Sequence, residues 1–197
     1  MVVGGGGVAE RKVMALVACG AVVRVVSRSG TSILQEMAAA GEIAFEARGY
    51  RAGDLSGALM AFAATGDSEV NRAVSAEADR LGVLCNVADS LEECDFIVPS
   101  VVQQGALQIA VSTGGAAPAV ARDIRRSLEG SFDAAWGDYV RLLGEMRVLV
   151  LARVTDGGAR KAIFDAIAGA GLLERLRAGE SLTAEQVFLE FVGAGAL

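Results

Sequence analysis

The feature that most constrains the fold of this chain is a run of four glycines at residues 4–7, directly after a pair of valines. Apolar residues follow the glycines at helical spacing, at positions 8, 13, 16 and 17. A strand that enters a helix through such a turn lets the backbone approach a pyrophosphate, which then sits on the free N–H groups of the helix N-terminus. In the pattern G-x-G-x-x-A, the small residues are Gly4, Gly6 and Ala9. A flexible glycine-rich N-terminus is the alternative interpretation.

Strand and helix patterns alternate through the first half of the chain. Strands are expected at residues 21–26, 43–47, 59–64 and 83–87, the second of them at a sheet edge, with helices at about 8–19, 32–40 and 67–81. Gly20, Gly41 and Gly82 stand where helices of this kind end. Repeated β-α-β units predict parallel strands with right-handed crossovers. Residues 1–98 are therefore expected to form a Rossmann-like α/β domain.

The end of the strand expected at 21–26 departs from the usual dinucleotide-binding pattern. An acidic residue would bind the ribose 2′-hydroxyl there, but this chain has Ser27-Arg28-Ser29. Arg28 either meets a 2′-phosphate, which would favour NADP, or is simply a solvated arginine. The loop from Ala64 to Asp67 follows another strand, close to where a nicotinamide ribose would lie. Asp67 is either part of that site or only the N-cap of the next helix.

Composition excludes several classes of function. With 53% hydrophobic and 21% charged residues among 197, the chain is predicted to be a soluble globular protein. The longest uncharged run, residues 96–121, contains glutamines, prolines and a glycine turn, so we expect no membrane span. No signal peptide is visible, which makes the cytoplasm the expected location. A net charge of −6 argues against nucleic acid as a partner.

The residue types that are missing or unpaired restrict the chemistry further. The chain has no histidine, which excludes Ser-His-Asp and Cys-His catalysis and histidine zinc sites. Proton transfer must therefore fall to carboxylates, lysine, tyrosine or cysteine. Cys19, Cys85 and Cys94 form no C-x-x-C pair and are odd in number, so we expect reduced, mostly buried thiols rather than a disulfide framework.

The pattern changes from Phe96 onward. Residues 96–102 and 107–111 are predicted as strands of a hairpin that turns at 103–105. A second glycine-rich turn, at residues 112–118, then opens a helix that runs to about Glu129. This turn and the arginines after it are either an anion site for substrate carboxylates or a loop with proline in the first helical turn and solvated arginines. Residues 133–197 show only helix patterns, broken near 156–158 and 178–180.

Several motifs in order carry a resemblance to a known family. They are residues 3–12, Ala63-Ala64-Thr65, Val70-Asn71, Cys85-Asn86-Val87-Ala88-Asp89, residues 94–99 and residues 112–119. Over residues 1 to about 150 the chain resembles the precorrin-2 dehydrogenase and sirohydrochlorin ferrochelatase family, which forms the N-terminal half of bacterial sirohaem synthase and also occurs as stand-alone proteins. The resemblance implies NAD-dependent oxidation of precorrin-2 to sirohydrochlorin, with insertion of ferrous iron as a second activity in some members.

The resemblance also implies an organisation and a set of site residues. It implies a Rossmann-like NAD-binding domain at 1–98, a central α+β dimerisation domain at 99–147 that interlocks with its partner in a homodimer, and a helical C-terminal domain at 148–197. Asp89 would be the catalytic residue. The residues that would bind NAD are Gly4, Gly6, Gly7, Val8, Arg28, Ser29, Ala64 and Thr65, with NADP kept open because of Arg28. The residues that would bind precorrin-2 or sirohydrochlorin are Asn86, Ser112, Thr113, Gly114, Gly115, Arg122 and Arg125.

Alternatives remain open for both the residue and the function. A carboxylate at the carboxyl end of a strand is well placed to take a proton from a substrate, whereas composition alone favours a turn or cap aspartate at position 89 and the motif match favours the catalytic role. The rival function is a dinucleotide- or tetrapyrrole-binding protein that senses or carries its ligand without turnover. It is supported by the short first strand and the missing ribose acid. No metal-ligating residues are predicted, and any iron insertion would rest on carboxylates.

Overall fold

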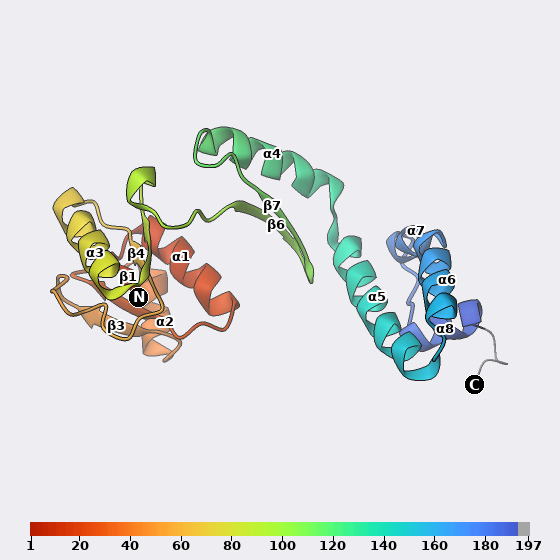
Figure 1. The fold of residues 1–197 in the computed structure, drawn as a ribbon. Helices are drawn as coiled ribbons and strands as arrows, with labels where there is room; N and C mark the ends of the chain where they lie inside the picture. Colours follow the sequence, from red (N-terminus) through yellow and green to blue (C-terminus); the bar gives the residue numbers. More distant parts are fainter. Residues whose placement is uncertain (193–197) are drawn as a thin grey trace. The chain divides into compact units, whose positions relative to one another are not determined.

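The computed structural model describes residues 1–192 of the chain. It divides them into two compact units, one of residues 1–98 and one that begins at Pro99 (Figure 1). None of the helices in the described residues is both long enough and apolar enough to cross a membrane.

The first unit is built on a five-stranded parallel sheet with the strand order β3-β2-β1-β4-β5. The strands are β1 (Val2–Val3), β2 (Arg24–Ser27), β3 (Ala44–Ala47), β4 (Met60–Ala63) and β5 (Leu84–Val87). The connecting helices are α1 (Gly7–Ala18), α2 (Ser32–Ala39) and α3 (Ser68–Leu81). The predicted Rossmann-like α/β fold is confirmed, and β3 lies at the edge of the sheet as expected.

The two-residue strand β1 is the centre of this sheet. Its residues register with β2 on one side and β4 on the other. Val2 and Val3 are 0% and 1% exposed and point to opposite faces, because successive side chains alternate along a strand. The pairing continues past the strand, since Gly4 N–H donates to the Val26 carbonyl at 2.9 Å and Ala64 N–H donates to the Val3 carbonyl at 2.8 Å. The short strand is therefore fixed from both sides.

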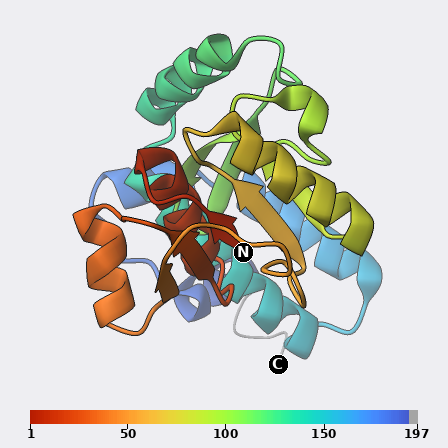
Figure 2. The same ribbon diagram turned by 90° about the vertical axis from the view of Figure 1, so that its left-hand side faces the viewer.

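Helices cover both faces of the sheet (Figures 1 and 2). On one face α1 and α2 bury Ala9, Val13 and Leu34 against the strands, and on the other α3 buries Val74 and Ala78. In this arrangement the carboxyl ends of the strands and the N-termini of the helices that follow them lie at the same end of the sheet.

Two strands begin later in the structure than the sequence pattern predicts. The strand expected at 21–26 begins at Arg24, and the strand expected at 59–64 begins at Met60. Val22 and Leu59 are 102% and 80% exposed, so their hydrophobic side chains extended the pattern without belonging to the core. The expectation of mostly buried thiols also fails for Cys19, which is exposed just after α1, whereas Cys85 is buried and Cys94 is partly buried.

The second unit begins with an antiparallel hairpin of β6 (Ser100–Gln104) and β7 (Leu107–Val111), on which α4 (Pro118–Ser131) packs. The helices that follow are α5 (Ala134–Arg153), α6 (Gly157–Ala168), α7 (Leu172–Arg177) and α8 (Ala184–Val192). They share an apolar core that includes Leu142, Met146 and Phe188. The hairpin is as expected, but its first strand begins at Ser100 rather than at residue 96.

The helix α5 runs without interruption across position 147, where the central and C-terminal domains are expected to meet. The division of the chain into three domains stays a prediction. A break that the sequence pattern did not indicate separates α6 from α7, where Gly171 adopts a left-handed φ of 65°.

Candidate functional site

The carboxyl ends of the sheet strands open onto three neighbouring hollows. The glycine hollow is lined by Gly4, Gly5, Gly6, Ser27, Ser29, Gly30, Thr31, Ala64, Thr65 and Gly66. The Arg28 hollow is lined by Val3, Gly4, Val26, Ser27, Arg28, Gly49, Tyr50, Thr65, Asp67 and Val70. The Asp89 hollow is lined by Thr65, Gly66, Ser68, Asn71, Arg72, Val87, Ala88, Asp89, Ser90 and Glu93. Thr65 lines all three, so the hollows adjoin one another at this residue, and we refer to them together as the crevice.

Close packing of the backbone requires glycine at the first two positions of the run, Gly4 and Gly5. Gly4 has a φ of 122°, and a Cβ added there would lie 2.3 Å from the Ala64 carbonyl oxygen. A Cβ added to Gly5 would lie 1.9 Å from the Ser29 carbonyl oxygen. These residues let the turn pass directly against the ends of β2 and β4. Gly5 was not among the expected site residues, although its place in the run marked it.

The next two glycines face open space instead. A Cβ on Gly6 would meet no atom within 4 Å, and one on Gly7 would meet only Arg11 Nη1, at 3.8 Å. Gly6 is the N-cap of α1 and provides no side-chain cap. The N–H groups of Gly7, Val8 and Ala9 therefore have no partner within the helix, and the helix dipole places positive potential beside them. This cradle, with the Arg11 guanidinium nearby, fits the pyrophosphate of a dinucleotide.

The end of β2 presents a cation where many dinucleotide sites present an acid. Arg28 and Ser29 are exposed beside the crevice, and within residues 1–192 the guanidinium of Arg28 has no hydrogen bond or ion pair. A free cation suits a 2′-phosphate, but an exposed arginine needs no ligand. Both interpretations of Arg28 stay open.

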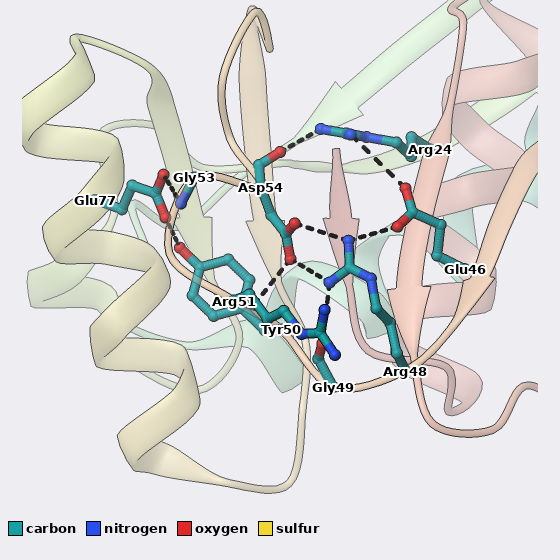
Figure 3. Close-up of polar contacts among 9 residues, drawn as sticks. All are labelled: Arg24, Glu46, Arg48, Gly49, Tyr50, Arg51, Gly53, Asp54 and Glu77. Carbon is teal, nitrogen blue, oxygen red and sulfur yellow. Dashed lines mark hydrogen bonds and ion pairs between the residues drawn. The ribbon is translucent and has the colours of Figure 1, made fainter.

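The loop after β3 supplies Gly49 and Tyr50 to the lining of the Arg28 hollow, and polar contacts that the sequence patterns did not indicate hold this loop (Figure 3). Arg48 donates from Nη1 and Nη2 to the carboxylate of Asp54, at 2.7 and 2.8 Å, and also contacts Glu46. The Arg48 guanidinium holds the pKa of Asp54 below its usual value. Tyr50 lines the hollow and donates its hydroxyl to the buried Glu77, and burial followed by this bond raises the pKa of Tyr50. These contacts hold the loop after β3 to Glu46 of β3 and to Glu77 of α3.

Asn71 fixes Thr65 at the junction of the three hollows. Thr65 N–H donates to Asn71 Oδ1 at 3.2 Å, and Asn71 Nδ2 donates to the Thr65 carbonyl at 3.1 Å. The Asn71 side chain is buried, with 8% exposure. A polar residue on the buried face of a helix was the available signal for this role, but it was not singled out as a site residue. Asp67 is the N-cap of α3, since its Oδ1 accepts from Glu69 N–H at 2.9 Å.

Asp89 lies in the turn after β5, exposed at the end of the crevice. Its φ of 62° makes it the one residue other than glycine in the described chain with a left-handed backbone. Aspartate tolerates this conformation better than most residues, which agrees with the turn interpretation. The same hollow also holds Glu93, and Arg72 Nε lies 3.9 Å from Glu93 Oε1. Two carboxylates and one guanidinium thus surround this end of the crevice.

Asn86 lies on β5 and is largely buried. It is 8% exposed, and its Nδ2 donates to the Phe96 carbonyl at 3.0 Å. The ring of Phe96 packs edge-on against Phe62 at 5.5 Å. The amide of Asn86 therefore anchors the chain that leaves β5. The role of Asn86 in substrate binding stays a prediction.

The second glycine turn belongs to the second unit. Gly114 and Gly115 both have positive φ, 62° and 84°. Ser112 Oγ accepts from Gly114 N–H at 3.1 Å, and Thr113 Oγ1 accepts from Ala117 N–H at 3.1 Å. Both hydroxyls thus hold the turn together.

The two arginines expected to bind substrate have acidic neighbours on their own helix. On α4, Arg122 Nε lies 3.3 Å from Asp123 Oδ1, and Arg125 pairs with Glu129. Exposed pairs of this kind are weak and exchange readily. The anion-site and loop interpretations of this region both stay open.

Among the described residues there is no group of three or more aspartate, glutamate or cysteine side chains arranged to hold a metal ion. The features that line the crevice are the glycine cradle, Thr65 and the carboxylates of Asp89 and Glu93.

Comparison with known families adds two matches. A family model described as "Putative NAD(P)-binding" matches residues 1–100, about half of the chain. A second family model, for the central part of sirohaem biosynthesis proteins, matches residues 104–131.

Individual relatives extend these matches over the whole chain. The chain is 35% identical to a sirohaem synthase of Methylococcus capsulatus over 196 residues, which is 100% of this chain and 41% of that protein. It is 38% identical over 190 residues to the sirohaem synthase of Stutzerimonas stutzeri, covering 96% and 41% of the two chains. The chain thus spans about two fifths of the length of these relatives. A solved structure titled SirC, precorrin-2 dehydrogenase, has a TM-score of 0.81 at 24% identity, covering 97% of this chain and 92% of that one.

Proposed function

The chain belongs to the family of NAD(P)-binding sirohaem biosynthesis proteins, and from this premise we propose that it oxidises precorrin-2 to sirohydrochlorin. The observation that carries the proposal is the crevice in which one sheet edge holds both the cofactor cradle and Asp89, joined through Thr65. A binding protein without turnover would need the cradle but not a carboxylate at its far end. The resemblance of the motifs and the names of the relatives favour the same chemistry.

A nicotinamide dinucleotide is the cofactor of this family, and the residues at the crevice fit it. Gly6, Gly7 and Val8 would hold the pyrophosphate through backbone N–H groups at the start of α1. Ala64 and Thr65 would lie toward the nicotinamide ring, and Ser29 toward the adenosine ribose. When bound, the dinucleotide supplies the acceptor for a hydride.

The protein must then remove a proton, because oxidation of precorrin-2 to sirohydrochlorin takes a hydride and a proton from the substrate. We assign this step to the Asp89 carboxylate, which would accept the proton as general base. Its exposed position in the turn after β5 gives it access to a large substrate and to water.

The preferred dinucleotide is NAD in this proposal, on the basis of the family resemblance. The free guanidinium of Arg28 supports NADP as the alternative. Equilibrium titration of the protein with each oxidised dinucleotide, at one ionic strength, measures the preference directly. Tighter binding of NADP would contradict the choice of NAD.

The carboxylate-rich macrocycle requires cations and N–H donors as well. We propose that Ser112, Thr113, Gly114 and Gly115, followed on α4 by Arg122 and Arg125, bind carboxylates of the substrate. Substrate carboxylates would replace the weak acidic partners of the two arginines, and the positive end of α4 would add to their attraction. In the proposed assembly the protein is a homodimer.

One anaerobic experiment tests the dehydrogenase directly. Enzymatically prepared precorrin-2 and NAD are added to the folded protein, and the absorbance of sirohydrochlorin is followed. No NAD-dependent change would contradict the proposal and favour the binding protein. Ferrous iron added afterwards shows whether sirohydrochlorin is converted further, which separates an enzyme limited to oxidation from one that also inserts iron.

Substitution of Asp89 tests its assignment. Asp89→Ala should bind the dinucleotide normally but turn over about 10²- to 10⁴-fold more slowly, the usual contribution of a general base. Asp165→Ala is the matched control, because Asp165 is an exposed aspartate on α6 in the second unit. Equal turnover by the Asp89 variant and the control would show that another group takes the proton.

A further inference from the structure

The thiol of Cys94 lies inside the turn that carries Asp89. Cys94 directly follows a short 3-10 helix, η1 (Leu91–Glu93), and its Sγ accepts from Val87 N–H at 3.1 Å. The same Sγ lies 3.1 Å from the Ser90 carbonyl oxygen and 3.3 Å from the Val87 carbonyl oxygen. A thiol has one proton, so it donates to one of these carbonyls at a time. Cys94 thereby joins both ends of the segment 87–90.

Asp89 needs such support because its backbone is in an unfavourable region. A left-handed backbone is unfavourable for a residue with a side chain, and it persists where its surroundings hold it. On the side of the sheet, Ala88 N–H donates to the Ala63 carbonyl at 2.8 Å. On the opposite side the bond between Cys94 and Ser90 closes the turn. Asp89 lies between these two attachments.

Cys94 is itself held firmly to the sheet. The next residue, Asp95, donates its N–H to the Cys85 carbonyl at 2.9 Å and accepts from Cys85 N–H through Oδ2 at 2.7 Å. Asn86 Nδ2 lies 3.5 Å from the sulfur and donates to the Phe96 carbonyl at 3.0 Å. The sulfur is therefore fixed relative to β5, and the turn is fixed relative to the sulfur.

We propose that Cys94 is a positioning residue for Asp89, acting through hydrogen bonds of its thiol to Val87 and Ser90. The inference rests on the proposed role of Asp89 in proton removal. Cys94 is not among the residues that line the Asp89 hollow, so its effect on the reaction would pass through the turn. This role would also give a reason for a thiol at this position, since the three cysteines of the described residues are free.

Three variants separate positioning from general stability. Cys94→Ala removes the sulfur and its hydrogen bonds, whereas Cys94→Ser keeps a group that can donate and accept. Cys19→Ala is the matched control, because Cys19 is an exposed cysteine at the end of α1. Cys94→Ala should lower kcat by about ten- to a hundredfold, as expected when a reacting group is misplaced, and leave the KM for NAD unchanged. Cys94→Ser should recover part of the loss, and Cys19→Ala should behave as the parent protein.

Hydrogen exchange followed by mass spectrometry tests the positioning without any substrate. In Cys94→Ala, amide exchange should become faster in residues 88–93 and stay unchanged in α3. Unchanged exchange in 88–93, or equally faster exchange throughout residues 1–98, would overturn the positioning role. Unchanged kcat in an active Cys94→Ala protein would overturn it as well. If the parent protein shows no turnover, the proposed function fails, and the exchange measurement still decides whether Cys94 holds the turn.

Discussion

Replacing Gly4 and Gly7 separately by alanine should distinguish the two uses of the glycine run. Gly4 has a φ of 122°, and its new Cβ would lie 2.3 Å from the Ala64 carbonyl oxygen, an approach that real Cβ atoms do not show. Gly7 is the first residue of α1, and its new Cβ would have only the end of the Arg11 side chain nearby, at 3.8 Å. The two substitutions add the same methyl group to the same turn.

The expected magnitudes follow from these two environments. For Gly4→Ala, the backbone strain costs about 1–3 kcal/mol. Displacement of the packed Ala64 segment adds about 1–3 kcal/mol. A loss of at least about 2 kcal/mol lowers the Tm of a unit of this size by roughly 8 °C or more. Gly7→Ala should leave the Tm unchanged or raise it slightly, since alanine is the better helix former, by about 0.5–1 kcal/mol. Its methyl group would enter the cofactor cradle and weaken NAD binding by roughly ten- to a hundredfold.

Calorimetric unfolding and NAD titration of both variants measure these effects. The reasoning would be refuted by a Gly4→Ala protein that melts like the parent, because the close approach of the backbones would then carry no cost. It would also be refuted by a Gly7→Ala protein that binds NAD with the affinity of the parent. A Gly7→Ala protein with the melting loss expected for Gly4→Ala would contradict the assignment of open space to Gly7.

Two further predictions concern charged groups around the Arg28 hollow. Asp54→Asn should destabilise the protein by about 1–3 kcal/mol at neutral pH, because it breaks a charged pair with Arg48. The pKa of Asp54 is lowered in the folded protein, so its contribution to stability is complete well above the ordinary value of 3.8 and is lost as the pH falls through the lower folded value. The free energies of unfolding of the two proteins, measured in urea, should therefore converge in strong acid. A constant difference at every pH would argue against this origin. Arg28→Ala should leave NAD binding unchanged if Arg28 is solvated. A selective loss of NADP binding, measured by titration with both dinucleotides, would instead assign it to a 2′-phosphate.

Much of the fold could be predicted because its signals are local. The alternation of apolar strands, amphipathic helices and closing glycines indicated the β-α-β units, and Gly82, with its left-handed φ of 66°, ends α3 where expected. Strand starts were less certain, since Val22 and Leu59 are hydrophobic but exposed. A hydrophobic residue next to a strand contributes to the sequence pattern in the same way whether its side chain packs in the core or faces water.

Some features of the candidate site could likewise be predicted from local patterns, whereas others depend on long-range contacts. The sequence alone determined that a glycine turn follows the first strand, that Arg28 replaces an acid after the second, and that Asp89 follows the last strand of the sheet. These are properties of neighbouring residues, and motif order linked them to one family.

Only the tertiary structure decided which contacts each residue makes around the crevice. It showed that Gly4 is crowded while Gly7 is open, that the amide of Asn86 is used by Phe96, and that the thiol of Cys94 closes the turn around Asp89. Each of these facts is a contact between atoms whose approach depends on how the chain packs, and such contacts leave no periodic trace in the sequence. The sequence therefore determined which chemical groups follow the strands of this sheet, and packing determined which contacts those groups make within the protein.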